Sequence, residues 1–283
     1  MKIERTKNTG RNILTGTVMK LFTMLMPFAM RTVMIYCMGE EYLGLNSLFT
    51  SVLQVLNLAE LGIGSAMVFS MYKPISEDDH ATVCALMRLY RLYYRLIGLA
   101  VGVLGLILLP FIPHLISGDI PSELNIYILY LMNLAATVLS YWLFAYRSSL
   151  LAAHQRMDVS NLVNLAGQIL QYGLQLVIIL CWKNYYLYVA AILLCQILSN
   201  IGSALASKRM FPDYRPEGEL PKALKRDINH RIRDLFISKL GGVVLGSADT
   251  IVISAFLGLA ILARYQNYFF ILTSVCGFLE VLL

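Results

Sequence analysis

Long apolar runs fill most of this chain, and their length restricts what it can fold into. A helix needs about 20 mostly apolar residues to cross the hydrocarbon layer of a membrane. Runs of that length recur along the sequence, so we predict an all-α polytopic membrane protein with eight transmembrane helices: residues 13–38, 43–71, 88–116, 124–147, 161–182, 185–206, 236–257 and 262–283.

Composition supports this class over the soluble ones. The 283 residues are 58% hydrophobic and only 14% charged, with a mean hydropathy of +0.66, which is more apolar surface than one soluble core can bury. The net charge of +6 does not indicate nucleic-acid binding, because Lys and Arg fall between the apolar runs. The first run is too long for a signal peptide, so it predicts a retained signal anchor.

The basic residues predict the orientation, since cytoplasmic loops carry an excess of Lys and Arg. They concentrate in the N-terminus and in the second, fourth and sixth connections. Lys20 lies inside the first span, and only Arg31, Lys183 and Arg264 fall on the other side. We therefore expect a cytoplasmic N-terminus and short outer loops such as residues 117–123, which leave no room for an exported domain.

Cysteine and histidine give no sign of a metal site, a disulfide or a catalytic triad. The five cysteines show no CxxC spacing and the four histidines are scattered. We expect no metal and no cofactor.

A basic linker divides the chain into unequal parts. We predict an N-terminal lobe of six helices over residues 1–206, a cytoplasmic linker with a short surface helix over residues 207–235, and the first two helices of a second lobe over residues 236–283. The stretch "MRTVMIYCMG" ending at Gly39 aligns weakly with "DTIVISAFLG" ending at Gly258. A parallel repeat of this kind is typical of transporters built from two halves around a central site.

Glu60 is an ionisable residue in the second span. It lies about 25 Å from the outer end, nearly level with Lys20 in the antiparallel first span. A charge at the centre of a membrane helix is costly, so an ion pair between Glu60 and Lys20 would explain both residues. Such a pair is either a static lock between helices or part of coupling-ion or proton movement, and the sequence leaves both readings open.

Arg31 and Asp249 form a second pair of candidates, each about 12 Å from the outer end of its span. In the repeat alignment they occupy adjacent positions of the two halves. We expect them to meet across a central cleft, either as a gate or anion-handling pair or as a static tie between the lobes.

The fifth span carries a row of amides at spacings of three and four residues, which places them on one helix face: Asn161, Asn164, Gln168, Gln171 and Gln175. Lipid cannot solvate such a face. A water-filled cavity satisfies amides without special geometry, so cavity lining is favoured over a dry helix contact. Gln54 and Asn57 in the second span, with shorter polar faces in the fourth and sixth, predict the same translocation path.

Two stretches resemble a known family. "YLGLNSLFTSVLQVLNLAELGIGSAMVFSMYKPISEDD" (residues 42–79) resembles the second-span region of Wzx-type polysaccharide flippases, and "SADTIVISAFLG" (residues 247–258) is similar to their seventh span. The resemblance implies a MATE-like two-lobe fold in the bacterial cytoplasmic membrane. It further implies that the protein moves undecaprenyl-diphosphate-linked oligosaccharides outward for capsule, O-antigen or exopolysaccharide synthesis. The polysaccharide polymerase and chain-length proteins are the partners it suggests.

The family typically has 12 to 14 spans, so the resemblance also implies that this chain is truncated within the second lobe. Alternating access around a hydrophilic cavity is the expected mechanism, and no enzymatic activity is expected. Two alternatives stay open: a MATE-like ion-coupled exporter of small molecules, and a membrane-embedded glycan polymerase. A polymerase would need a larger outer loop than this sequence has.

Overall fold

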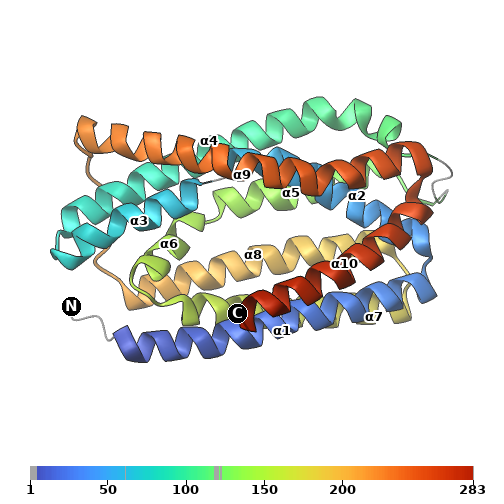
Figure 1. The fold of residues 1–283 in the computed structure, drawn as a ribbon, viewed down its shortest axis with the longest axis horizontal. Helices are drawn as coiled ribbons and strands as arrows, with labels where there is room; N and C mark the ends of the chain where they lie inside the picture. The colour runs from blue at the N-terminus through green and yellow to red at the C-terminus, as the bar shows by residue number, and fades with distance from the viewer. Residues whose placement is uncertain (1–4, 61, 118–120, 122, 283) are drawn as a thin grey trace.

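Nearly the whole described chain is helical, as a bilayer requires, because backbone N–H and C=O groups there must be satisfied within the segment. The computed structural model describes all residues except 1–4, 61, 118–120, 122 and 283. For residues 5–7, 59, 145, 245 and 277–282 it describes the backbone but not the side chains. The all-α prediction is confirmed. In chain order the elements (Figure 1) are α1 (Arg5–Cys37), α2 (Glu40–Leu56), the short 3₁₀ helix η1 (Asn57–Glu60), α3 (Ile63–Ser76), α4 (His80–Leu108), the 3₁₀ segment η2 (Leu109–Leu115), α5 (Ile126–Trp142), α6 (Ala145–Ala153), α7 (Met157–Cys181), α8 (Tyr185–Met210), α9 (Lys222–Leu257) and α10 (Leu259–Leu282).

Within the described residues, five helices are long and apolar enough to cross a membrane: Asn8–Cys37, His80–Leu115, Met157–Cys181, Tyr185–Met210 and Lys222–Leu257. A sixth span is added if α5 and α6, which meet at a bend of 53°, are counted as one broken span. The count of eight spans and the two-lobe arrangement stay predictions. The predicted outer loop at residues 117–123 lies largely outside the described residues.

The second span is not one continuous helix, so the prediction of a single helix over residues 43–71 is wrong. α2 ends at Leu56, and α3 begins only at Ile63, after η1. Gly62, which precedes α3, has a φ of +91°, a conformation that glycine adopts without strain. A Cβ at Gly62 would lie 2.5 Å from the Cβ of Leu235, so α9 approaches the break too closely for any side chain there.

The linker is shorter than predicted. α8 continues to Met210, and α9 runs without interruption from Lys222 to Leu257 over 36 residues. The expected surface helix is therefore the first part of α9, and only residues 211–221 form the non-helical connection. Pro221 stands at the N-cap of α9, where a missing N–H costs nothing, and no further proline interrupts the helix.

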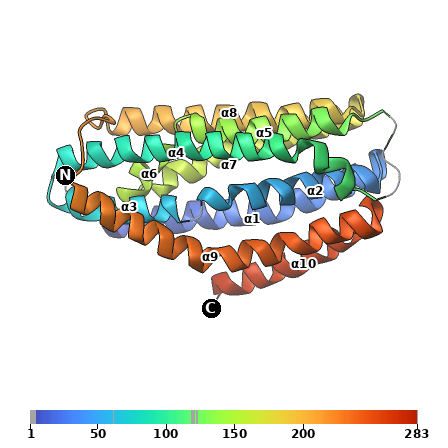
Figure 2. The same cartoon turned by 90° about the horizontal axis from the view of Figure 1, so that it is seen from above.

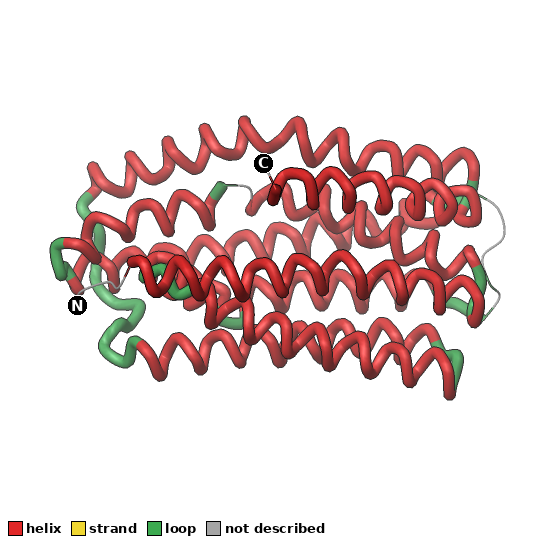
Figure 3. The backbone as a smooth tube through the Cα atoms, turned by 60° about the horizontal axis from the view of Figure 1, so that its bottom comes forward, coloured by secondary structure: helices red, strands yellow, loops and turns green. Residues whose placement is uncertain are grey.

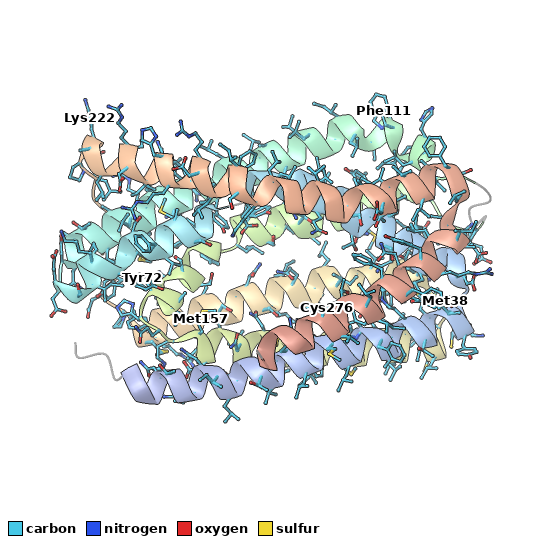
Figure 4. All side chains as sticks on the ribbon, viewed as in Figure 1. Met38, Tyr72, Phe111, Met157, Lys222 and Cys276 are labelled. Carbon is cyan, nitrogen blue, oxygen red and sulfur yellow. The ribbon has the colours of Figure 1, made fainter. Side chains whose placement is uncertain are left out.

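Most of the helices run along one common direction, and most of the loops lie at the two ends of the bundle, while shorter breaks lie between those ends (Figure 3). α9 and α10 form an outer pair beside α1 and α2 (Figure 2). α10 packs closely on α2, because a Cβ at Gly44 would collide with the carbonyl oxygen of Leu259. Tyr72, Met157 and Lys222 lie toward the end of the bundle where α1 begins (Figure 4). We call this end, which also holds residues 211–221, the basic end.

A buried carboxylate joins α1 to the start of α7 at the basic end. The side chain of Asp158 is 2% exposed and accepts hydrogen bonds from Arg156 Nε at 2.9 Å and Nη2 at 3.2 Å. Arg11 Nη2 lies 2.8 Å from the same carboxylate. Asn12 accepts from the Asp158 backbone N–H at 2.7 Å and donates to the carbonyl of Gln155 at 3.0 Å. These contacts fix the register of α1 against α7.

Candidate functional site

The open face of α2 is polar. Thr50 and Gln54 are the only exposed residues of this helix, and nine of its other residues are buried. Asn46 and Asn57 lie on the same side, since successive helical residues are about 100° apart. A helix face toward lipid would carry apolar side chains, so this exposed polar face is not typical of a lipid-facing surface, and that it lines a translocation path stays a prediction.

The amide row of α7 lies on the side of the helix away from its exposed apolar residues. That exposed side consists of Leu162, Ile169, Leu170, Leu176, Val177 and Leu180. α7 packs against α1 and α8, so the row faces the interior of the bundle. Asn164 is exposed on this inner side, whereas Gln168 and Gln171 are half-buried.

Burial of these amides increases from Asn164 to Gln175. Gln175 is 1% exposed, and its Nε2 donates to the carbonyl of Tyr188 on α8 at 3.5 Å. The Oε1 atoms of Gln168 and Gln175 are buried without a protein partner. Buried amide oxygens are normally hydrogen-bonded to protein or to water, so these two positions call for bound water or ligand hydroxyls. That the whole row lines a water-filled passage stays a prediction.

α8 adds a third polar face. Gln196 is exposed and Asn200 donates to the carbonyl of Ser140 on α5 at 3.5 Å. Both lie on the side opposite the exposed apolar residues of α8, which are Leu187, Leu194, Leu198, Ile201 and Leu205. By contrast, the polar residues of α5 bond to carbonyls of their own helix: Asn133, Thr137 and Ser140. Their polar groups are satisfied locally, so they contribute little to an open polar surface.

Arg31 does not meet Asp249 in this conformation. The half-buried guanidinium of Arg31 donates to Asn267 Oδ1 at 3.4 Å and lies 4.8 Å from the ring centre of Phe270, both on α10. Asp249 is exposed on α9 and accepts from the hydroxyl of Tyr265 at 2.9 Å. The partners of Arg31 on α10 are therefore an amide and an aromatic ring, and the predicted pairing of Arg31 with Asp249 is not formed.

The expected ion pair between Lys20 and Glu60 is likewise not formed. Lys20 is exposed and lines a small cavity of about 130 Å³ together with Thr23, Thr273 and Ser274. It therefore faces the C-terminal half of α10, whereas Arg31, farther along α1, contacts residues of the N-terminal half of α10. The two cations lie eleven residues apart, close to three full helical turns, and so share one side of α1.

Glu60 is held by tyrosines. Tyr94 donates to Glu60 Oε1 at 2.6 Å, and Tyr141 donates to Oε2 at 2.9 Å. Tyr90 donates in turn to the hydroxyl oxygen of Tyr94 at 3.0 Å. Glu60 ends η1, at the break between α2 and α3, while Tyr141 lies at the end of α5, just before the bend into α6. One carboxylate thus connects α4 to both interrupted helices.

Sequence reasoning did not find this tyrosine cluster. Tyr90 and Tyr94 are spaced four apart in "RLYRLYYRL", which places them on one face of α4, and that spacing was the available signal. Tyr141 comes from another helix about 80 residues away from Glu60, and nothing in the sequence connects them. The Gly-Ile-Gly step at residues 62–64 coincides with the break between η1 and α3 and was the available signal for it.

The fold is that of a multi-pass helical membrane protein with interrupted helices, and polar side chains share one face of each of α2, α7 and α8. The chain matches the family described as polysaccharide biosynthesis protein over residues 9–283, and it belongs to that family. The resemblance drawn from residues 42–79 and 247–258 is thereby confirmed. No curated protein and no solved structure matches the chain.

Proposed function

We propose that this chain moves undecaprenyl-diphosphate-linked oligosaccharide units from the inner to the outer leaflet of the bacterial cytoplasmic membrane by alternating access. The observation that carries this proposal is the exposure of Gln54, Asn164 and Gln196 on the inward sides of α2, α7 and α8. Amides that are exposed on the side away from the apolar outer surface can exchange hydrogen bonds with sugar hydroxyls. Membership of the polysaccharide biosynthesis family agrees with such a substrate.

The diphosphate of this substrate requires cations along the path. Lys20 and Arg31 lie on the same side of α1, about 16 Å apart along the helix axis. Neither forms a salt bridge with a described carboxylate, so each is available to an anion. A cation inside the membrane lowers the cost of bringing a diphosphate out of water, because opposite charges attract strongly at low dielectric.

Glu60 is the proposed coupling group. Both oxygens of Glu60 accept hydrogen bonds from tyrosine hydroxyls, so the carboxylate acts only as an acceptor in these contacts. A proton on Glu60 would turn one of its acceptor oxygens into a donor, and the hydroxyl of Tyr94 or Tyr141 would have to rotate or withdraw. Since these residues meet where α2–α3 and α5–α6 are interrupted, such a change would act on the points of the bundle best able to bend.

The test is replacement of Arg31 by Ala in cells whose surface polysaccharide depends on this protein. We expect surface polysaccharide to be lost and lipid-linked units to accumulate on the inner leaflet, while membrane insertion is unchanged. Arg31→Lys should retain part of the activity, and Arg209→Ala, at an exposed basic residue of α8, is the matched control with full activity. A normal amount of surface polysaccharide in the Arg31→Ala cells would contradict a role for Arg31 in the translocation path.

A second set of variants tests the passage itself. Gln54→Leu and Asn164→Leu keep side chains of similar size but make the inward faces apolar. We expect strongly reduced export of the glycan without loss of the folded protein. Leu162→Gln, on the outer side of α7, would show whether any polar change in that helix has the same effect. Equal export in the wild type and in both inward variants would contradict the proposed passage.

A further inference from the structure

A basic pocket lies at the basic end, outside the polar faces described above. It has a volume of about 560 Å³ between α4, the connection at residues 216–220 and the first turns of α9. Its cationic lining residues come from two helices: Arg88, Arg91 and Arg95 from α4, and Lys222 and Lys225 from α9. Figure 4 shows Lys222 at the corner of the bundle where α9 begins.

Most of the positive charge of this pocket is not balanced by carboxylates of the protein. The only carboxylate in the lining is Glu219, which lies 3.6 Å from Arg88 Nη1, while the same Arg88 nitrogen donates to the carbonyl of Gly218 at 2.8 Å. None of the other four cations forms a salt bridge with a described carboxylate. A pocket with this excess of positive charge favours a ligand that carries several negative charges, and phosphate groups have that chemistry.

An apolar pocket lies next to the basic one along the same two helices. It has a volume of about 350 Å³, and most of its lining is apolar: Ile63, Leu96, Ile97, Ile232 and Phe236. Arg233, whose Nη2 lies 3.4 Å from Asp234 Oδ1, is the one charged residue in this lining. Tyr93 of α4 donates to Asn229 Oδ1 of α9 at 2.6 Å, and both residues also line this second pocket. The basic pocket lies nearer the ends of the two helices, and the apolar pocket lies farther along them.

The order of residues along each helix fixes this arrangement. On α9, Lys225 of the basic pocket is followed at spacings of four and three by Asn229 and Ile232, so all three lie on one face. On α4, Leu92 lines the basic pocket and Leu96, one turn farther along, lines the apolar pocket. Leu96 is 53% exposed, so an apolar chain can reach this groove from the surrounding lipid.

We propose that this crevice binds a lipid whose headgroup carries phosphate, with the headgroup among the five cations and a hydrocarbon chain in the apolar pocket. A soluble phosphate compound would use only the first pocket and leave the second unexplained. The lipid comes from the leaflet at the basic end, and two sources share this chemistry: an anionic phospholipid and a polyprenyl diphosphate. The inference concerns a separate site on the outer side of the bundle and does not depend on the transport proposal.

The experiment measures lipid binding to the purified full chain in detergent by native mass spectrometry. The probes are phosphatidylglycerol, undecaprenyl diphosphate, phosphatidylcholine and inorganic pyrophosphate. The double variant Arg91→Gln, Lys225→Gln removes two pocket charges, and Lys208→Gln, Arg209→Gln removes two exposed charges at the same end as a matched control. A basic residue near an anionic lipid surface contributes about 1 kcal/mol, which is about fivefold in affinity, so we expect about 25-fold weaker binding in the pocket variant.

Two further variants separate folding from binding. Arg91→Lys keeps the charge and should bind like the wild type, which would show that the pocket tolerates substitution. Phe236→Ala should weaken the binding of both anionic lipids several-fold and leave pyrophosphate binding unchanged. Tighter binding of undecaprenyl diphosphate than of phosphatidylglycerol would assign the crevice to the diphosphate lipid, and the reverse would assign it to a phospholipid.

Either of two results would overturn the inference. The first is equal lipid affinity in the pocket variant and in the matched control, which would mean that the crevice is not the binding site. The second is pyrophosphate binding as tight as lipid binding, which would mean that no hydrocarbon chain is recognised. Transport activity enters neither measurement, so a failure here leaves the proposed function untouched.

Discussion

Removing single hydroxyl groups around Glu60 gives the sharpest test of the tyrosine cluster. Tyr90, Tyr94 and Tyr141 are 3%, 6% and 5% exposed, so water does not readily replace a lost donor at any of them. Tyr94 and Tyr141 each donate to the carboxylate, at 2.6 and 2.9 Å, whereas Tyr90 donates only to the hydroxyl of Tyr94. Phe substitutions keep the rings and remove only these donors.

The three substitutions should differ in cost. A hydrogen bond to a charged group contributes about 1.5–3 kcal/mol, and one between neutral groups about 1 kcal/mol. Tyr90→Phe should therefore cost about 1 kcal/mol of unfolding free energy, and Tyr141→Phe about 2 kcal/mol. Tyr94→Phe also leaves the buried Tyr90 hydroxyl without its acceptor, which adds about 1–3 kcal/mol, so it should cost about 4 kcal/mol.

Denaturant unfolding of the purified chain in one detergent measures these differences. A double-mutant cycle with Glu60→Gln then isolates the role of the carboxylate. In the Glu60→Gln background the Tyr141→Phe cost should fall to that of a neutral hydrogen bond, about 1 kcal/mol. An unchanged cost in that background, or a larger loss for Tyr90→Phe than for Tyr94→Phe, would refute the proposed arrangement.

Three further outcomes follow from contacts elsewhere in the bundle. Asp158→Ala should lower the unfolding free energy by about 3 kcal/mol, because the largely buried guanidinium of Arg156 would then lose its carboxylate partner. The double variant Asp158→Ala, Arg156→Ala should be only slightly less stable than Asp158→Ala alone. Burial lowers the pKa of His154 below its ordinary value of 6.5, so protonation favours the unfolded chain. Stability should therefore be full above about pH 6.5 and decrease below it, and His154→Phe should flatten that part of an unfolding series between pH 5 and 8. Gly44→Ala should cost about 1–3 kcal/mol in thermal unfolding, because its Cβ would collide with the carbonyl of Leu259; an unchanged midpoint would contradict the close packing of α10 on α2.

The sequence predicted which polar side chains share one helix face, because helical periodicity is a local property. Spacings of three and four place the amides of α7 on one face whatever surrounds the helix. Exposed apolar residues such as Leu162 and Ile169 then occupy the other side, as hydropathy requires of a helix in lipid. Membership of the family could also be predicted from residues 42–79, since the recognition of a motif in a continuous stretch of sequence needs no tertiary information.

Pairings between distant residues could not be predicted in the same way. Lys20 and Glu60 were matched by depth and charge, yet depth fixes only one of three coordinates. The structure turns Lys20 toward α10 and surrounds Glu60 with tyrosines from α4 and α5. Arg31 was matched with Asp249 on the same grounds, and the neighbour that the packing provides is Asn267.

The sequence by itself determined that this chain is a helical membrane protein of the polysaccharide biosynthesis family, and which residues share each helix face. Only the tertiary structure decided where helices break and which polar groups meet. Gly62 shows the reason: glycine permits a turn at any position, but the close approach of α9 at Leu235 decides that the chain turns there. Local periodicity is set by covalent geometry, whereas contacts depend on how all the helices pack at once.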